Sequence, residues 1–538
     1  MKRSETGKRL LTLPNLLACL IILLGVSLIG YFILFPAWGY FHSDCTDTIL
    51  WAQAGYDAGG LFNADFTYAC LLPFGGQLLM QPFIGLFGVS TTTHAIGMLL
   101  FLALFVTAAV CFCRSMKWSM SWTAIMVTAL LLLLSSSEKL REIFWGHIIY
   151  YSLGILFLLV GLALAFSTLN AMEAPGGLFT RQALIPAAFS LLWMFLCSTN
   201  GLQALTIFAF PLLVGILGER FFDTKSSWCS RQNRFTAGYA GALLLAACAG
   251  CLVGGLLKSG LTQGYFDAYS TFSGPDKWMD NLRGFLPHWL TLLGVDVAGG
   301  EPLTDFDGIR NLVRIGFAIL LLLVPVATTL CYRRYTQRYM KILLIAHWTL
   351  TALIMMAYVF GSLSAANWRL SPIVASSILL LVAFSRWLVM ESGAPRIGFL
   401  TLAPAFLACL IVLTTILSMP HDYKKDEGLQ GVSSFLEANG MTYGYATFWN
   451  AQAITVLSDS KVKVRNIDID ETGEIASNPY QSQSTWFKPQ PEPQTYFLLL
   501  TDWEYSQLAS GDGALDNRVE TLTYPGYQIV VLDSCPFG

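Results

Sequence analysis

The sequence predicts an all-α polytopic membrane domain with about eleven transmembrane helices, followed by a small α/β domain outside the membrane. Of its 538 residues, 55% are hydrophobic and 12% are charged, whereas about a quarter of the residues are charged in an ordinary soluble domain. Runs of about twenty apolar residues, long enough to cross a bilayer, recur along the chain as far as residue 418. The net charge of −2 gives no reason to expect a nucleic-acid partner.

The expected spans are the apolar runs at residues 13–35, 93–113, 119–136, 149–169, 183–200, 202–218, 236–257, 313–331, 342–361, 371–390 and 397–418. The first run is longer than the apolar core of a signal peptide and has no small-residue cleavage site, so we expect it to be a span. Ion-coupled transporters usually carry acids or bases near the bilayer midplane. Very few ionisable residues lie inside these runs, which disfavours a transporter.

Charged residues are distributed unevenly between the loops. Lys and Arg predominate in the N-terminal segment and in the loops after every second span, whereas Asp and Glu predominate in the other loops. The positive-inside rule therefore predicts a multi-pass plasma-membrane protein with a cytoplasmic N-terminus. A transmembrane domain at 1–420 would then have outer loops at 36–92, 135–148, 258–312 and 362–371, followed by an extracytoplasmic domain at 421–538.

The first outer loop begins with two carboxylates and an imidazole, in the stretch His42-Ser43-Asp44-Cys45-Thr46-Asp47. Acids at a membrane boundary cost little when they face water, so a solvated loop start is the simple alternative to a site. The stretch 51–88 is aromatic, rich in glycine and half polar, which is typical of interfacial helices on the outer surface. Cys45 and Cys70 are the only cysteines of this loop, and in an oxidising compartment they could form a disulfide.

Further polar side chains lie in the other outer loops. The short loop contains Glu138, Arg141, Glu142 and His147, and the loop at 362–371 contains Arg369. The long loop at 258–312 alternates aromatic and charged residues. This pattern suits a cap over a site at the membrane surface, and it suits equally well a set of aromatic anchors at headgroup level.

After Pro420 the chain becomes polar and alternates short helix-like and strand-like pieces, which predicts a small α/β domain. The helix-like pieces are 429–439 and 503–508, and the strand-like pieces are 443–447, 461–467, 495–500 and 528–531. The aromatic stretch 443–451 could present ring faces and an amide to a sugar, although a strand that runs into a helix is the simpler interpretation.

No P-loop, dinucleotide fingerprint, Ser-His-Asp constellation or zinc-ligand cluster is evident, so no cofactor is indicated. The polar outer loops instead suit an enzyme whose substrate has its lipid tail in the bilayer and its phosphate and head group at the outer surface. A carboxylate such as Asp44 or Asp47 could take the proton of an attacking hydroxyl group. An arginine could hold the departing phosphate, because it has a permanent charge and a fork of donors.

This combination resembles the GT-C superfamily of membrane glycosyltransferases, which includes the protein mannosyltransferases. The likeness depends on the many spans, the cytoplasmic N-terminus and the acidic first outer loop. It also depends on a late outer arginine next to an aromatic residue and a proline, in Trp368-Arg369-Leu370-Ser371-Pro372. The resemblance implies inverting transfer of a sugar from a polyprenyl-phosphate donor, embedded among membrane lipids, to a glycan, lipid or protein acceptor.

The resemblance also implies roles for individual residues. Asp44 matches the first-loop acid that serves as general base, and Asp47 is the second catalytic candidate. Arg369 and Arg141 are expected to bind the donor phosphate. The polar residues expected to contact the substrate are His42, Glu138, Glu142 and His147.

The sequence departs from the family pattern in two places. Asp44 is followed by Cys45 and not by a second acid, so the base stays open between Asp44 and Asp47, and a divalent metal is possible but unsupported. In the late element the aromatic Trp368 precedes Arg369, whereas in the family it follows the arginine. Two other interpretations stay open: a polysaccharide polymerase or ligase, and a non-catalytic membrane protein that displays its C-terminal domain.

Overall fold

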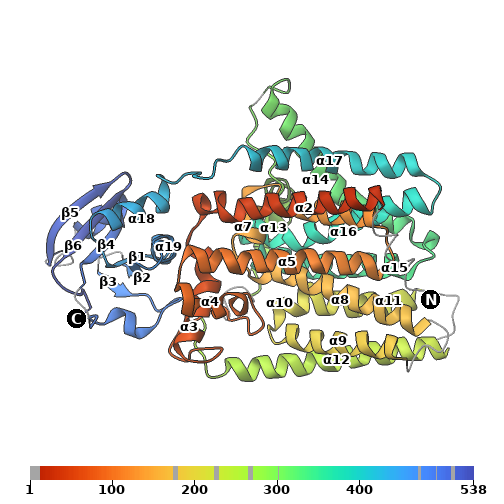
Figure 1. Ribbon diagram of the computed structural model, residues 1–538, viewed down its shortest axis with the longest axis horizontal. Coiled ribbons are helices and arrows are strands. Elements are labelled where there is room, and N and C mark those ends of the chain that lie inside the picture. The colour runs from red at the N-terminus through yellow and green to blue at the C-terminus, as the bar shows by residue number, and fades with distance from the viewer. Residues whose placement is uncertain are drawn as a thin grey trace.

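The computed structural model describes residues 12–173, 180–222, 230–264, 271–300, 302–470, 474–491, 494–509, 515 and 517–537. A bundle of long helices makes up most of the molecule, and a smaller domain built on a β-sheet lies at one end of the bundle (Figure 1). The N-terminal residues 1–11, which supply part of the charge bias used for orientation, lie outside the described residues. Residues 265–270 and 301 of the long outer loop lie outside them as well.

Ten helices in the described part of the chain are long and apolar enough to cross a membrane. They are α2 (Leu13–Leu34), α5 (Thr91–Ser115), α8 (Tyr150–Glu173), α9 (Arg181–Ser198), the run of α10, η4 and α11 (Leu202–Phe221), α12 (Arg231–Lys258), α14 (Phe306–Leu330), α15 (Arg338–Phe360), α16 (Ser371–Met390) and α17 (Pro395–Leu417). A further pair, α6 (Met120–Leu133) and α7 (Glu138–Trp145), is bent by 113°, and counting it as one span brings the total to 11. The predicted polytopic all-α domain is therefore confirmed.

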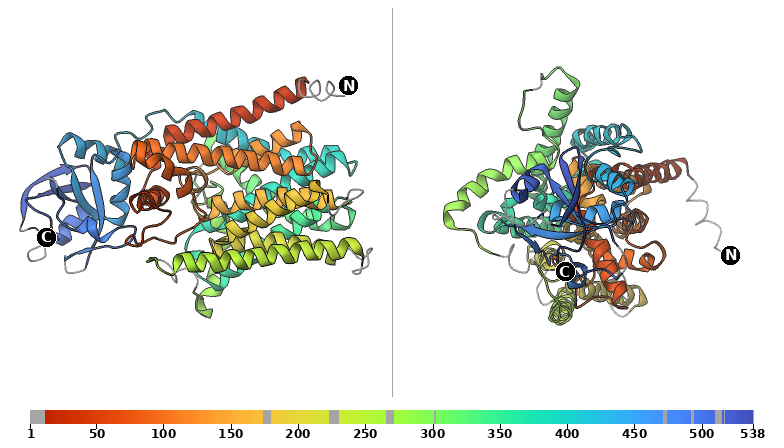
Figure 2. Two further views of the ribbon diagram at one scale, coloured as in Figure 1. Left: turned by 60° about the horizontal axis from the view of Figure 1, so that its bottom comes forward. Right: turned by 90° about the vertical axis from the view of Figure 1, so that its left-hand side faces the viewer.

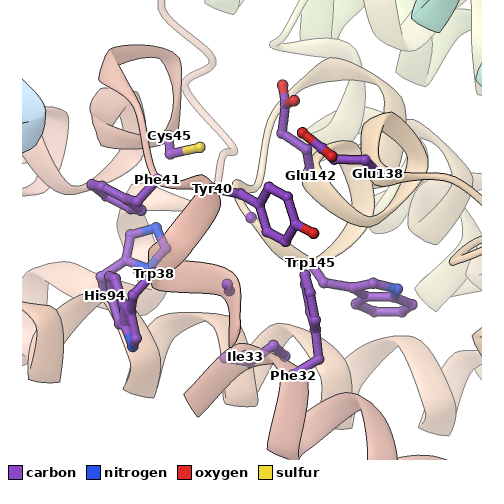
Figure 3. A pocket seen from close by; sticks show the side chains of 12 residues that line it. Phe32, Ile33, Trp38, Tyr40, Phe41, Cys45, His94, Glu138, Glu142 and Trp145 are labelled. Atoms are coloured by element: carbon purple, nitrogen blue, oxygen red, sulfur yellow. The ribbon is translucent and has the colours of Figure 1, made fainter. Parts of the chain in front are cut away.

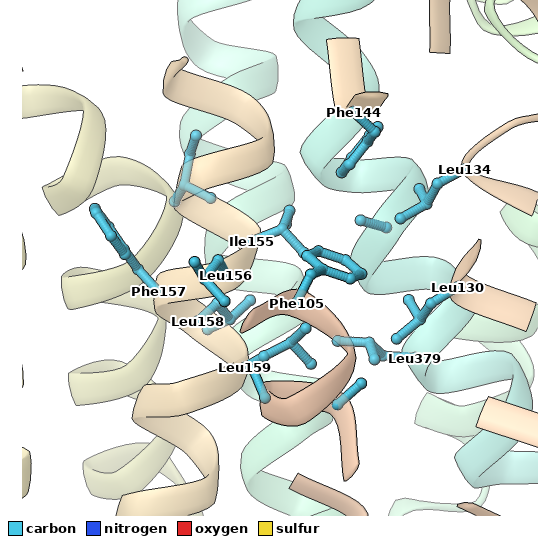
Figure 4. Packing of buried hydrophobic residues seen from close by; sticks show 14 of the residues in the cluster. Phe105, Leu130, Leu134, Phe144, Ile155, Leu156, Phe157, Leu158, Leu159 and Leu379 are labelled. Atoms are coloured by element: carbon cyan, nitrogen blue, oxygen red, sulfur yellow. The ribbon is translucent and has the colours of Figure 1, made fainter. Parts of the chain in front are cut away.

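Leucine, isoleucine and phenylalanine side chains fill the centre of the bundle. Because a bilayer offers no water to satisfy backbone N–H and C=O groups, apolar runs of this length fold as helices. The helices α8 and α16 lie deepest, since 83% of the apolar window of each is buried inside the protein. Figure 4 shows Phe105 of α5 and Phe144 of α7 packing near Ile155 of α8 and Leu379 of α16. This packing holds α7 across the end of α6 and so fixes the polar residues that α7 carries.

Short helices connect the spans at the end of the bundle that carries the sheet domain (Figure 1). The first outer loop folds into η1 (Pro36–Tyr40), η2 (Ser43–Thr46), α3 (Asp47–Asp57) and α4 (Gln77–Phe87). The long outer loop contains α13 (Pro275–Leu292), and the late loop contains η6 (Leu363–Ala365) and η7 (Asn367–Leu370). Both α3 and α4 lie beside the sheet domain (Figure 1), at the end of the bundle away from the start of α2 (Figure 2).

The sheet domain has six strands in the order β3-β2-β1-β4-β6-β5. They are β1 (Tyr443–Thr447), β2 (Lys463–Ile469), β3 (Ile475–Ser477), β4 (Tyr496–Thr501), β5 (Arg518–Tyr524) and β6 (Tyr527–Leu532). The central strands β2, β1 and β4 are parallel, and the outer pairings are antiparallel. The helices are α18 (Gly428–Ala438), α19 (Gln452–Leu457) and α20 (Asp502–Ala509). The predicted α/β domain is confirmed, although β3, β5 and α19 are not among the predicted pieces.

The sheet domain is docked on the first outer loop. Ala453 and Val456 of α19 are fully buried and belong to the same hydrophobic core as the helix bundle. At the rim of the contact, Thr91 Oγ1 donates to Asp459 Oδ1 at 2.7 Å, and Ser460 Oγ donates to the Val89 carbonyl oxygen at 2.6 Å. Apolar burial together with hydrogen bonds fixes the domain on the bundle, so its side chains can take part in a site on the outer loops.

Candidate active site

The two first-loop carboxylates differ in their surroundings. Asp44 lies in η2 and is partly exposed, and no hydrogen bond to its carboxylate occurs among the residues that the structure describes. Asp47 begins α3 and is 6% exposed, and its Oδ1 atom accepts a hydrogen bond from Gln481 Nε2 at 2.6 Å. Burial, and then the nearby Asp44, raises the pKa of Asp47 well above its usual range. Asp47 is therefore held in its neutral form more readily than an ordinary carboxyl, and Asp44 is the more accessible of the two carboxyl groups.

The two histidines of the predicted site meet one carboxylate. Glu142 Oε1 lies 3.3 Å from His42 Nε2 and 3.7 Å from His147 Nε2, and Glu142 Oε2 lies 2.5 Å from Lys139 Nζ. Burial alone would raise the pKa of Glu142, but the hydrogen bonds from His147 and His42 outweigh it and hold that pKa well below its usual range. The ionised Glu142 thus joins the first outer loop to α7.

The helix α7 is placed by a cap at its start. Ser137 Oγ accepts from the backbone N–H of Leu140 at 3.1 Å, as expected of an N-cap residue. The same hydroxyl donates to the carbonyl oxygen of Leu292 at 2.6 Å, at the end of α13. The cap therefore sets both where α7 begins and how it lies against the long outer loop.

An open cavity of about 370 Å³ lies between α7, the end of α13 and the start of α14. We call it the basic pocket; its lining includes the cations Lys139, Arg141 and Arg314 and the acids Glu138 and Asp296. The Arg141 side chain is 6% exposed, and its Nη1 atom donates to the Ser135 carbonyl oxygen at 3.0 Å. A surplus of cations around an open cavity is suited to an anionic group.

One buried hydroxyl of the basic pocket has no hydrogen-bond partner among the residues that the structure describes. Ser136 lines the pocket and is 5% exposed, and its Oγ atom makes no hydrogen bond within the described part of the chain. A buried polar atom normally finds a partner. The unsatisfied Ser136 hydroxyl is therefore available to a ligand that enters the pocket.

A second, much smaller cavity adjoins α7, and its lining includes Tyr40, Cys45, His94, Glu138 and Glu142 (Figure 3). Its volume of about 20 Å³ is enough for a water molecule and not for a sugar. Glu138 lines both cavities, so the start of α7 borders the small space next to Cys45 as well as the open basic pocket.

Arg369 lies beside the basic pocket but is not one of the residues that line it. Its side chain is 7% exposed, and Nη1 donates to the carbonyl oxygen of Ser362 at 2.5 Å. The neighbouring Trp368 ring lies 4.6 Å from Lys139 Nζ, and Asn367 Nδ2 donates to Thr291 Oγ1, a lining atom, at 3.1 Å. The late loop thus packs against Lys139 and Thr291, two residues that line the pocket.

The structure therefore brings most of the predicted site residues into one region at the end of the bundle next to the sheet domain. It adds three residues that the sequence analysis does not select: Lys139, Arg314 and Gln481. Lys139 could have been found from its place inside the short charged loop, whereas Gln481 has no signal in the sequence. Cys45 and Cys70 do not form a disulfide; the Cys70 Sγ atom accepts from Gln203 Nε2 at 3.3 Å.

No group of three or more His, Cys, Asp or Glu side chains that could hold a metal ion occurs among the described residues. The Glu142 cluster contains one carboxylate and two imidazoles, and the carboxylate is already paired with Lys139. We therefore assign no chemical step to a metal.

Comparison with known proteins gives a likeness of fold. No family model matches the chain, and no curated protein matches it in sequence. The crystal structure of ArnT from Cupriavidus metallidurans in the apo state matches over 95% of this chain and 97% of that chain, with a TM-score of 0.51 and 11% sequence identity. The chain therefore has the GT-C fold, with its membrane helices and its C-terminal domain.

Two further solved structures are similar at lower scores. ArnT from Cupriavidus metallidurans bound to undecaprenyl phosphate has a TM-score of 0.49 and 11% identity, over 95% of this chain and 97% of that chain. The oligosaccharyltransferase of Archaeoglobus fulgidus, tethered to an acceptor peptide, has a TM-score of 0.42 and 12% identity, over 83% of this chain and 63% of that chain.

Proposed function

We propose that the protein is a membrane glycosyltransferase that moves a sugar from a polyprenyl-phosphate donor to an acceptor at the outer face of the membrane. The acceptor would be a hydroxyl-bearing glycan, lipid or protein. The GT-C fold over nearly the whole chain is consistent with this function. The fold alone does not establish it, because a fold carries many functions and the chemistry lies in the site.

The observation that carries the proposal is the contact between His42 and Glu142. His42 directly precedes η2, which contains Asp44, and Glu142 pairs with Lys139, which lines the basic pocket. Glu142 thereby links the turn that carries Asp44, which can accept a proton, to a cavity that can hold a phosphate. Base and anion site are the two parts that sugar transfer from a lipid phosphate requires.

In the proposed reaction, the acceptor hydroxyl attacks the anomeric carbon of the donor sugar while Asp44 takes its proton. The new bond from carbon to the acceptor oxygen forms as the bond from carbon to the phosphate oxygen breaks. The leaving polyprenyl phosphate keeps the bonding electrons and gains negative charge, which Arg141 and Lys139 stabilise. Because attack and departure occur on opposite faces in one step, the anomeric configuration inverts.

Two observations favour Asp44 over Asp47 as the base. Asp44 is partly exposed, whereas Asp47 is buried and already accepts a hydrogen bond from Gln481. A general base must come within hydrogen-bond reach of the hydroxyl whose proton it takes. We therefore propose that Asp44 is the base and that Asp47 holds the loop that carries it.

The donor phosphate is proposed to bind in the basic pocket, with Arg141 as its main partner. Arg369 does not line the pocket, and its proposed contribution is to add positive charge behind the phosphate site from the late loop. The candidate substrate contacts are His42, Glu138, Glu142 and His147. We further propose that the sheet domain and these loops face away from the cytoplasm, because acids predominate in the outer loops of the sequence.

The function can be tested by incubating purified protein in lipid vesicles with a panel of polyprenyl-phosphate sugars and candidate acceptors. Release of free polyprenyl phosphate is the readout, because every donor of this class yields it whatever its sugar. NMR of the glycosylated product would show whether the configuration is inverted. Release that is faster than in vesicles without the protein supports a transferase, and no release from any donor would contradict it.

The interpretation as a non-catalytic carrier of a displayed domain is less well supported. A displayed domain needs a free surface and a linker, whereas this domain packs Ala453 and Val456 into the core of the bundle. It is also bonded to the candidate catalytic loop through Gln481. A polymerase or ligase would use the same basic pocket, and the identity of the product in the vesicle assay would separate it from a single-sugar transferase.

A further inference from the structure

The residues on both sides of the proposed base are held by the sheet domain. Ser43 Oγ donates to the carbonyl oxygen of Phe448 at 2.5 Å, and Asp47 Oδ1 accepts from Gln481 Nε2 at 2.6 Å. Asp44 lies between these two attachments, on the turn that runs from η2 into α3. The position of Asp44 is therefore determined by two contacts with a domain some 400 residues later in the chain.

Gln481 uses both ends of its amide. Its Nε2 atom donates to Asp47, and its Oε1 atom accepts from Trp51 Nε1 at 2.7 Å. An indole N–H can only donate, so the Gln481 oxygen must face Trp51 and the amino group must face Asp47. Because Asp47 and Trp51 are four residues apart, they lie on the same face of α3. A single side chain thus holds the first turn of the helix.

Gln481 is itself held firmly. It is 1% exposed, and its backbone has a φ of 54°, a conformation uncommon for a residue with a Cβ atom. Gln452 Nε2 donates to the Gln481 carbonyl oxygen at 3.3 Å, and the next residue, Ser482, accepts a hydrogen bond from the backbone N–H of Thr67 at 3.0 Å. The amide therefore projects from a segment fixed on both sides, by the sheet domain and by the first outer loop.

We propose that Gln481 is a positioning residue for sugar transfer: it orients Asp44 by holding Asp47 and Trp51, and so makes the sheet domain a part of the catalytic apparatus. This role rests on the proposed function and goes beyond it, because it gives the C-terminal domain a task in catalysis. Gln481 does not touch the substrate in this account. It acts on the orientation of the base, on which the rate of proton transfer depends.

A reciprocal exchange of side chains tests this role. Gln481→Glu places an oxygen where the amino group was, so the hydrogen bond that Gln481 donates to Asp47 Oδ1 is lost and a second acidic group faces the buried Asp47. The double variant Asp47→Asn/Gln481→Glu restores the bond with its polarity reversed, because the new amide can donate to the new carboxylate while Trp51 still donates to the other oxygen. The double variant also keeps the number of acidic residues of the wild type.

We expect the substitution to change kcat strongly and the donor KM only slightly. Gln481→Glu should lower kcat by roughly 10- to 100-fold while changing the donor KM less than about twofold, because orientation of the base is lost and donor binding is not. Asp47→Asn/Gln481→Glu should recover most of kcat. The matched control is Gln507→Glu, the same substitution at an exposed residue of the same domain, which should leave both constants unchanged.

Folding is monitored by size-exclusion chromatography and thermal unfolding in detergent. Ser43→Ala removes the attachment on the other side of Asp44 with a smaller structural change, and it should lower kcat in the same direction without affecting the donor KM. A wild type that releases no polyprenyl phosphate contradicts the proposed function itself. If the wild type is active, two results would overturn the role of Gln481. One is a folded Gln481→Glu variant that keeps full kcat, and the other is a folded double variant that stays as slow as Gln481→Glu.

Discussion

The Nε2 atom of His42 lies 3.3 Å from Oε1 of Glu142, so that one contact joins the start of the first outer loop to helix α7. The two residues are 100 positions apart in the chain and come from loops that follow different spans. The contact places the Asp44 turn next to the charged residues that line the basic pocket. If the pair were broken, base and phosphate site would no longer be held relative to each other.

His42→Gln should destabilise the protein in a way that depends on pH. Burial opposes a charge on His42, but Cys45 and Glu142 favour it more strongly and raise the pKa of His42 to about 11. A raised histidine pKa contributes stability that is complete below the unfolded pKa of about 6.5 and declines as the pH rises toward the folded pKa. The melting temperature of the wild type should therefore exceed that of His42→Gln by more at pH 6 than at pH 9. An equal difference at both pH values would contradict the pairing.

Asp47→Asn should show a trend of the same sign at lower pH: the variant gains stability relative to the wild type as the pH rises. The pKa of Asp47 is raised by burial and by Asp44, so the folded protein holds a proton that the unfolded chain releases near its ordinary pKa of about 3.9. Stability then falls as the pH rises above that value. An asparagine has no proton to lose. The melting temperature of Asp47→Asn should therefore rise relative to that of the wild type between pH 5 and pH 8. If the melting temperature of Asp47→Asn instead falls relative to that of the wild type over this range, Asp47 is ionised in the folded protein.

Arg141→Ala should weaken donor binding. Removing the guanidinium takes a permanent cation from a cavity that would otherwise hold a phosphate, so the donor KM should rise by about tenfold or more. Arg141→Lys should recover only part of the loss, because a point charge cannot reproduce the fork of donors. Arg283→Ala is the control, since Arg283 lies in α13 with 75% of its side chain exposed. Equal KM values for Arg141→Ala and this control would remove Arg141 from the donor site.

Topology can be tested without knowing the substrate. The sheet domain lies at the end of the bundle away from the start of α2 (Figure 2). A reporter that is active only in the cytoplasm should therefore be silent when it is fused after Phe537, if the N-terminus is cytoplasmic. A reporter active only outside the cytoplasm should give a signal at the same position. The reverse pattern would place the basic pocket on the cytoplasmic side and overturn the proposed outer-face reaction.

The membrane domain could be predicted from the sequence because the bilayer imposes a strong local rule. A run of about twenty apolar residues has few choices other than a helix. The rule is weaker where a run ends. The sequence suggests a span at 119–136, whereas α6 ends at Leu133 and the chain turns by 113° into α7. Ser137, which caps α7, is the residue that marks this turn.

The site could be predicted only in part, because its residues are far apart in the sequence and come together only in the folded chain. Asp44, Glu142 and His147 were found because charged residues are rare in this chain and those in the outer loops stand out. Gln481 could not be found in this way: it is a neutral residue in a polar domain, and it meets Asp47 across 434 positions. The edge strand β5 was missed for a related reason, because its side chains are mostly exposed and its alternation of polar and apolar residues is interrupted at Glu520 and Thr521.

The measurement that tests the account most directly is the rate of sugar transfer by purified Asp44→Asn, Asp47→Asn and Asp65→Asn variants from the same polyprenyl-phosphate donor. Asp44→Asn keeps the size of the side chain and removes only its basicity, so kcat should fall by roughly 10²- to 10⁴-fold with little change in donor KM. Asp47→Asn should be at least about tenfold faster than Asp44→Asn, because an amide can still accept from Gln481. Asp65→Asn, an exposed acid in the same loop, should match the wild type. Full activity of Asp44→Asn would contradict the mechanism, and an Asp47→Asn variant as slow as Asp44→Asn would move the base to Asp47.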